Sequence, residues 1–385
     1  MSAKICNYFV ASNSSRGFIN YFEDNVRNLE KLYVLKGCSD SFKSSLIKNV
    51  GIDWFIKGYD IEYIHSPEDE KIVEAVIIPA LNTGVASGDI QYISESGAIK
   101  QKGEFIFLEE GESTRAILLS QKHISGLNKK IKKYYKKANK LLEKALKIRN
   151  KWEKLYTYNV SLEKVCNLVD NTIKKFLSYQ ALKKEGMIRN RFLGGLTHKG
   201  YVDFLKDLTK DVGNRYIIKG YPGPGKSILL QNLANTVQER GFDVELYHNC
   251  FDPARLDMVI VREMDLAVFD CTESNEVFGS RDGDEIIDIS PEAVNQDTDE
   301  TVNQDTDETA NRETNEAVNR ETDDIKKFDT LFKNYKEAVN DGVVFLKKAK
   351  EAFEKIEDEI KESIDLKEID KVYSDILEKI KKAVK

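Results

Sequence analysis

One short stretch limits the fold of this 385-residue chain more than any other. The sequence GYPGPGKS at 220–227 matches the Walker A phosphate loop, G-x-x-x-x-G-K-[ST]. Its glycines permit a tight turn whose backbone N–H groups face an anion. Lys226 offers a positive charge to the β- and γ-phosphates, and Ser227 offers a hydroxyl group to Mg²⁺. An apolar run, 216–218, precedes the loop, and an amphipathic pattern follows it to Arg240, which predicts a strand–loop–helix unit.

A second motif completes the predicted site. Residues 266–270, Leu-Ala-Val-Phe-Asp, form an apolar strand that ends in a carboxylate, which is the Walker B pattern. We therefore expect Lys226 and Asp270 to act in catalysis, and Ser227 and Asp270 to hold Mg²⁺ together with ATP. The residues expected to bind the nucleotide are Gly220, Pro222, Gly223, Pro224, Gly225, Lys226, Ser227 and Ile228.

The chain contains a second copy of this pattern 183 residues earlier. Gly37, Lys43 and Ser44 occupy the positions of Gly220, Lys226 and Ser227, and the match continues in one register for about eighty residues. The first copy has lost parts of the motif, because Phe42 replaces Gly225 and Ser87 replaces Asp270. A benzyl group at position 42 is expected to crowd the turn and intrude on the phosphate position. We therefore predict a nucleotide-free scaffold in the first copy and the activity in the second.

The fold class predicted from this pattern is α/β, with two tandem P-loop domains. Strands that alternate with helices predict a parallel sheet with flanking helices in each copy. A heptad seam from Leu127 to Leu155, and a similar one from Leu331 to Ile356, predict a long helical hairpin after each sheet. The expected domains are a degenerate P-loop domain (1–120), a first hairpin (121–183), an intact P-loop domain (184–290), an acidic repeat (291–324) and a second hairpin (325–385).

The acidic repeat consists of eight-residue units between 293 and 324, such as TVNQDTDE. These units carry almost no large apolar side chains, so they cannot bury enough surface to offset the entropy of ordering. Disorder is the prediction for this segment.

The composition narrows the cellular setting. The net charge is −6, so there is no global nucleic-acid signature. Five dispersed cysteines without C-x-x-C pairs predict reduced thiols and a cytoplasmic protein. We expect no membrane partner, since no apolar run is long enough to span a bilayer and the N-terminus lacks a signal-peptide core.

His248, Cys250 and Cys271 are candidate metal ligands in the second copy. The first copy keeps the histidine, as His65, but has Pro67 and Gly88 in place of the cysteines. A histidine retained without its companions favours a structural hydrogen-bonding role.

The arrangement resembles a bacterial family of tandem P-loop proteins that are described as ATPases or nucleotide-kinase-like. The segments that carry the resemblance are GYPGPGKS (220–227), HNCFDPARLDMVIV (248–261), VFDCT (268–272), SRDGDEIIDI (280–289), LKGCSDSFKSS (35–45) and EAVIIPAL (74–81). The resemblance implies ATP and Mg²⁺ binding without a known substrate. Phe42 departs from the family pattern, in which the first loop is commonly intact, and Arg262 replaces a usual proline, which the first copy keeps as Pro79.

Three functions are compatible with these motifs. The first is ATP hydrolysis, in which a carboxylate orients water and an arginine stabilises the transition state. Candidates for these two roles are Asp252, Glu263 and Glu273, and Arg262 and Arg281. The second is a nucleotide or small-molecule kinase, in which a hairpin covers the acceptor as a lid.

The third function is a nucleic-acid-responsive module that uses the lysine-rich helix 129–154. A solvated helix face explains the same lysines and is favoured by their number. The hairpins also predict self-association.

Overall fold

The structure is a computed structural model of the chain. It describes residues 3–108, 114–157, 181–220, 225–270, 281–289, 309–361 and 366–382, and the single residues 167, 171 and 174. Residues 291–308 of the predicted acidic repeat and most of 158–180, in the predicted first hairpin, lie outside the described residues. None of the described helices is long and apolar enough to cross a bilayer.

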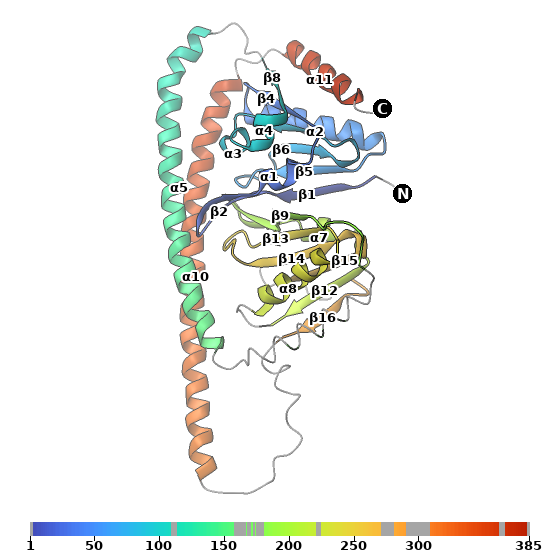
Figure 1. Ribbon diagram of the computed structural model, residues 1–385. Helices are drawn as coiled ribbons and strands as arrows, with labels where there is room; N and C mark the ends of the chain where they lie inside the picture. The colour runs from blue at the N-terminus through green and yellow to red at the C-terminus, as the bar shows by residue number, and fades with distance from the viewer. Residues whose placement is uncertain are drawn as a thin grey trace.

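Twelve of the described strands form one mixed sheet that runs through both halves of the chain (Figure 1). Its order is β16-β12-β15-β14-β13-β9-β1-β5-β6-β7-β4-β8, so the second half mirrors the first. The strands of the first half are β1 (Ile5–Phe9), β4 (Lys31–Lys36), β5 (Ile61–His65), β6 (Val73–Ile78), β7 (Thr83–Ser87) and β8 (Gly103–Phe107). Those of the second half are β9 (Ile188–Phe192), β12 (Asn214–Lys219), β13 (Val244–His248), β14 (Leu256–Val261), β15 (Leu266–Asp270) and β16 (Glu285–Asp288).

The two halves join at the centre of this sheet. Strands β1 and β9 pair antiparallel at Phe9 and Phe192, which are themselves 183 residues apart. The chain therefore folds as two repeats that share one sheet, whereas the sequence predicted two sheets.

Two small hairpins and several helices complete the repeats. The hairpins are β2 (Ala11–Ser14) with β3 (Gly17–Asn20), and β10 (Gly194–Thr197) with β11 (Gly200–Asp203). The short helices are α1 (Phe22–Val26), α3 (Gln91–Ser94), α4 (Gly97–Lys102) and α7 (Leu205–Thr209), with the 3₁₀ turns η1 (Pro79–Leu81) and η2 (Arg262–Met264). Helix α2 (Asp40–Ile56) follows β4, and helix α8 (Gly225–Glu239) follows β12.

The prediction of a purely parallel sheet is wrong. Strand β6 runs antiparallel to both β5 and β7, and β14 does the same in the second repeat. The reason is the length of the connections: only residues 66–72 join β5 to β6, and a parallel return needs a crossover of a dozen or more residues. All six residues of β6 are buried, as expected for a central strand that is covered on both faces.

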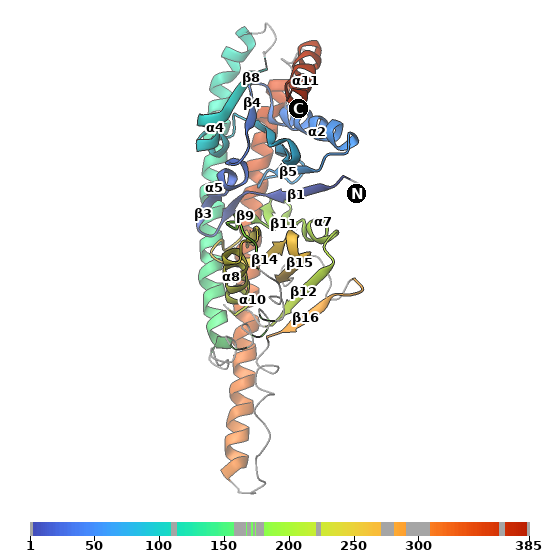
Figure 2. The same cartoon turned by 45° about the vertical axis from the view of Figure 1, so that its right-hand side comes forward.

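Two long helices, α5 (Thr114–Thr157) and α10 (Thr309–Lys361), lie side by side along both repeats (Figures 1 and 2). They are antiparallel, because contacts that rise along α5 fall along α10: His123 meets Glu359, and Tyr134 meets Phe345. Gly342 allows the two helices to approach closely, since a Cβ atom there would lie 3.0 Å from the side chain of Leu142. We call α5 and α10 the helical pair.

The prediction of one helical hairpin per repeat is wrong, because the long helices of the two repeats pack against each other. The predicted seam runs from Leu127 to Leu155. Leu127, Ala138 and Ala145 of this seam are buried, but its partner is the helix of the other repeat. Helix α10 also includes residues 309–324, for which the acidic repeat predicted disorder.

The last helix, α11 (Leu366–Lys381), packs on the first repeat although it follows the second in sequence (Figure 1). Ile376 and Ile380 are fully buried against the core around α2. The Tyr373 hydroxyl group donates to Asp53 at 2.8 Å, and Lys379 donates to Glu104 at 2.8 Å. The C-terminus of the chain is thus part of the first repeat's structure.

Candidate functional site

The two predicted motifs of the second repeat meet at one edge of the sheet. Strands β12 and β15 are parallel neighbours, and Ile218 is in register with Asp270. The loop after β12 and the carboxylate at the end of β15 therefore share the carboxyl edge. Pro222, Gly223 and Pro224 lie outside the described residues. Gly220 directly follows β12, and Gly225 and Ile228 lie at the start of α8.

The side chain of Lys226 connects the two motifs. Its Nζ atom is 2.8 Å from Oδ2 of Asp270 and donates to the carbonyl oxygen of Gly220 at 3.4 Å. Lys226 is only 5% exposed. A buried ammonium group is thus fixed at the mouth of the loop, opposite a carboxylate from the adjacent strand.

Ser227 already makes a structural hydrogen bond. Its Oγ atom accepts the backbone N–H of Leu256 at 2.8 Å. Ser44 accepts the N–H of Val73 in the same way, also at 2.8 Å. Because the first repeat also has this hydrogen bond, the bond alone can account for the serine at this position. The hydroxyl group still has a hydrogen atom and a second lone pair with which it could contact a further ligand.

The equivalent loop of the first repeat is closed by the protein's own carboxylates. Glu357, on α10, accepts the backbone N–H groups of Asp40 and Ser41, each at 2.9 Å. Its carboxylate also accepts the hydroxyl group of Ser41. Glu357 is buried, and it occupies the end of α2, where a helix N-terminus favours an anion.

Lys43, the counterpart of Lys226, is neutralised in the same manner. Its ammonium group lies 2.9 Å from Asp40 and also contacts Asp89. Burial lowers the pKa of Lys43, but these two carboxylates more than offset burial, so its pKa is raised above the ordinary value.

Phe42 does not close the first loop, contrary to the prediction. Its side chain packs against the apolar core around α2. Its backbone N–H donates to Ser39, the N-cap of the helix, at 3.3 Å. A carboxylate from a distant helix, and not an aromatic ring, fills the anion position.

The two histidines have matching structural roles. His248 lies 2.8 Å from the carbonyl of Pro253 through Nδ1 and 2.9 Å from Asn190 through Nε2. Asn190 in turn donates to Asp24 of the first repeat at 2.6 Å. The first repeat has the same chain of contacts, from His65 through Asn7 to Asp207 of the second repeat. Burial lowers the pKa of both histidines, for His65 to about 4.

Cys250 is buried at the same edge as His248, and Cys271 lies outside the described residues. In the part of the chain that the structure describes, no group of three or more histidine, cysteine or acidic residues is arranged to hold a metal ion.

Several residues expected near the phosphate lie at the wrong edge. Arg262 and Glu263 belong to η2, which precedes β15 and so lies at the end opposite to Asp270. Arg262 pairs with Glu245 at 3.1 Å. Arg281 donates to the carbonyl of Val212 at 2.9 Å, before β12 begins. Glu263 pairs with Lys184 at 2.8 Å. The predicted catalytic roles of Arg262, Glu263 and Arg281 are therefore wrong. Glu273 lies outside the described residues.

Asp252 does lie at the carboxyl edge, but two arginines hold it. Arg16, from the first repeat, is 2.7 Å away, and Arg255 is 3.2 Å away. Burial raises the pKa of Asp252, yet hydrogen bonding and charge from these arginines bring its pKa below the ordinary value. Sequence reasoning missed both arginines, although the position of Arg255, shortly after a predicted strand end, could have indicated it.

The helical pair contacts this edge of the second repeat. Tyr335 of α10 packs edge-to-face on Phe251, with ring centroids 5.5 Å apart. Arg149 of α5 lies over the same ring, and Glu153 of α5 pairs with Arg255. The loop that follows β13 is thus in direct contact with both long helices.

Comparisons with protein families, curated proteins and solved structures find no match to this chain.

Proposed function

We propose that the second repeat binds a nucleoside triphosphate with Mg²⁺ and hydrolyses it, while the first repeat supports the fold without binding nucleotide. The observation that carries this proposal is the 2.8 Å contact between Lys226 Nζ and Asp270 Oδ2. It brings a Walker A lysine and a strand-end carboxylate, distant in sequence, to one edge of the sheet.

The residues present fit the chemistry of such a site. Lys226 would move from Asp270 to the phosphates, and Asp270 would orient the metal's water shell. The hydroxyl group of Ser227 can serve as a metal ligand while it accepts the N–H of Leu256. Mg²⁺, when bound, neutralises charge on the phosphate oxygens.

The contact between the helical pair and the loop after β13 supports a coupling between hydrolysis and the position of the long helices. A change in this loop on nucleotide binding would act directly on Phe251, and through Tyr335 on α10. We infer that the long helices transmit the state of the nucleotide site along both repeats.

Titration of the full chain with ATP and Mg²⁺ tests the proposal. Lys226→Ala should weaken binding at least a hundredfold, and Lys43→Ala, the matched control in the first repeat, should leave the affinity within twofold of the parent. Asp270→Asn should retain nucleotide binding but release phosphate at least tenfold more slowly.

Failure of the full chain to bind ATP, or equal losses in the two lysine variants, would overturn the proposal. Phosphate transfer to an added acceptor, without phosphate release in its absence, would replace hydrolysis by kinase activity.

A further inference from the structure

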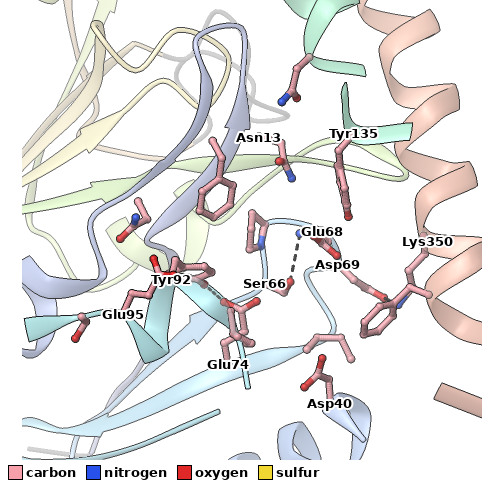
Figure 3. A pocket seen from close by; sticks show the side chains of 18 of the residues that line it. Asn13, Asp40, Ser66, Glu68, Asp69, Glu74, Tyr92, Glu95, Tyr135 and Lys350 are labelled. Atoms are coloured by element: carbon pink, nitrogen blue, oxygen red, sulfur yellow. Dashed lines mark hydrogen bonds and ion pairs between the residues drawn. The ribbon is translucent and has the colours of Figure 1, made fainter. Parts of the chain in front are cut away.

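The first repeat contains a cavity of about 1020 Å³ beside its closed phosphate loop (Figure 3). Its walls come from the β2–β3 hairpin, the loops that follow β5 and β7, and the helical pair. In Figure 3, Tyr135 and Lys350 enter from α5 and α10, opposite Tyr92 and Glu74. The cavity therefore lies at the edge of the sheet where the second repeat has its candidate nucleotide site.

Acidic side chains outnumber cationic ones in the lining of this cavity. Its lining includes one cationic side chain, Lys350, which pairs with Asp69 at 2.8 Å. The carboxylic acids of the lining are Glu23, Asp40, Glu68, Asp69, Glu74 and Glu95.

Glu68 and Glu74 are the central acids, and each accepts a hydrogen bond from a tyrosine hydroxyl group. The Tyr92 hydroxyl group donates to Glu74, which is only 4% exposed, and Tyr135 hydrogen-bonds to Glu68. Burial raises the pKa of both carboxyl groups. Burying such acids without a full countercharge costs free energy, and a bound cation would recover part of it.

Aromatic and aliphatic groups form the rest of the wall. Phe18, Tyr92, Tyr135 and Phe353 line the cavity, and aromatic faces attract ammonium groups while they pack against alkyl chains. Among the described residues, no acidic cluster has the arrangement of a metal site. An organic cation therefore fits this lining better than a divalent metal ion.

Some of these acids are specific to the first repeat, whereas Asp69 and Glu74 correspond to Asp252 and Asp257 in the second. Phe251 occupies the position of Glu68, and Lys206 that of Glu23, at the same 183-residue spacing. In the first repeat, Glu357 and Asp40 also neutralise the former anion site. The first repeat thus carries acids beside its strand ends that the second repeat lacks at the same spacing.

We propose that this cavity binds a small linear organic cation with two or more ammonium groups, of the polyamine class. The ammonium groups would pair with Glu68 and Glu74, and the methylene chain would lie against the aromatic wall. This site is independent of the proposed nucleotide site in the second repeat.

Calorimetric titration of the full chain with spermidine tests this proposal. We expect binding to one site, and at least tenfold weaker binding in the double variant Glu68→Gln and Glu74→Gln. Asp257→Asn, the counterpart of Glu74 in the second repeat, is the matched control and should leave the affinity unchanged. Lys350→Met should strengthen binding at least threefold, because it removes the lining's ammonium group.

Thermal unfolding of each variant shows whether it is folded. If the double variant does not fold, the titration is carried out with the single variants Glu68→Gln and Glu74→Gln. Lys226→Ala should bind spermidine like the parent, which separates this result from failure at the nucleotide site. Absence of spermidine binding, equal affinity in the folded glutamine variants, or competition by MgCl₂ at equal concentration would each overturn the proposal.

Discussion

In the first repeat, the carboxylate of Glu357 accepts hydrogen bonds from both the backbone N–H and the hydroxyl group of Ser41. The backbone nitrogen of Ser41 lies 2.9 Å from Oε2 of Glu357. Glu357 belongs to α10, so this contact ties the helical pair to the start of α2 in the first repeat. It places a carboxylate at the N-terminus of that helix, and the strength of this contact can be measured.

Glu357→Gln should destabilise the chain by about 1–3 kcal/mol, because a charged acceptor is lost from buried backbone donors. Urea unfolding gives this difference, and hydrogen exchange at Asp40 and Ser41 should become faster. Glu354→Gln, an exposed neighbour on α10, is the control and should change neither quantity. Unchanged exchange at Ser41 in Glu357→Gln would contradict the assigned contact.

Arg191 holds the two repeats together at the centre of the sheet. It is 1% exposed, pairs with Glu62 at 2.8 Å and lies over the ring of Tyr8 at 3.7 Å. Arg191→Met should cost about 3–5 kcal/mol, since it removes the cation that pairs with the partly buried Glu62 and the buried Glu245. Urea unfolding provides the test, with Arg189→Met, a partly exposed residue on the same strand, as the control. A cost below that of the control would show that this pair is not structural.

The stability of the chain should fall in acid because of Glu245. Burial raises the pKa of this carboxyl group, but Arg191 and Arg262 outweigh burial and lower its pKa from 4.5 to about 2. A lowered folded-state pKa stabilises the fold above the unfolded value, so the gain of about 3 kcal/mol is lost as the pH falls from 4.5 to 2.

Unfolding free energies at pH 6, 4 and 3 measure this loss when the parent is compared with Glu245→Gln. The comparison is necessary because the raised pKa of Glu74 has the opposite sign, so that its protonation favours the fold in acid. A constant difference between the two proteins across this range would contradict the assignment.

Helix α11 should matter most to the first repeat. Ile376→Ala should cost about 2–5 kcal/mol, because it opens a cavity against the core around α2. Hydrogen exchange should then show larger losses of protection in α2 than in α8. Lys371→Ala, an exposed position on α11, is the control. A greater loss of hydrogen-exchange protection in α8 than in α2 would contradict the packing of α11 on the first repeat.

Much of the local structure could be predicted from the sequence. The strand–loop–helix unit around Lys226 and the strand ending at Asp270 follow from apolar patterning and glycine spacing, and the structure places both. The 183-residue spacing also predicted the repetition, since each strand from β1 to β7 has its counterpart at that distance.

The tertiary pairings could not be predicted in the same way. A heptad seam shows that a helix needs an apolar partner but does not identify it, so α5 was assigned to the wrong neighbour. Glu357 is one acid among many on α10, and only its position against Ser41 distinguishes it. The short 66–72 connection, by contrast, did contain the information that β6 returns antiparallel.

The crossed contacts from Asn7 to Asp207 and from Asn190 to Asp24 have a consequence for the unit of folding. A polypeptide with one copy alone would lack a carboxylate for its asparagine, and it could recover that contact only by joining a second molecule about a two-fold axis. Fusion of the copies makes this dimerisation intramolecular, so that assembly no longer depends on protein concentration.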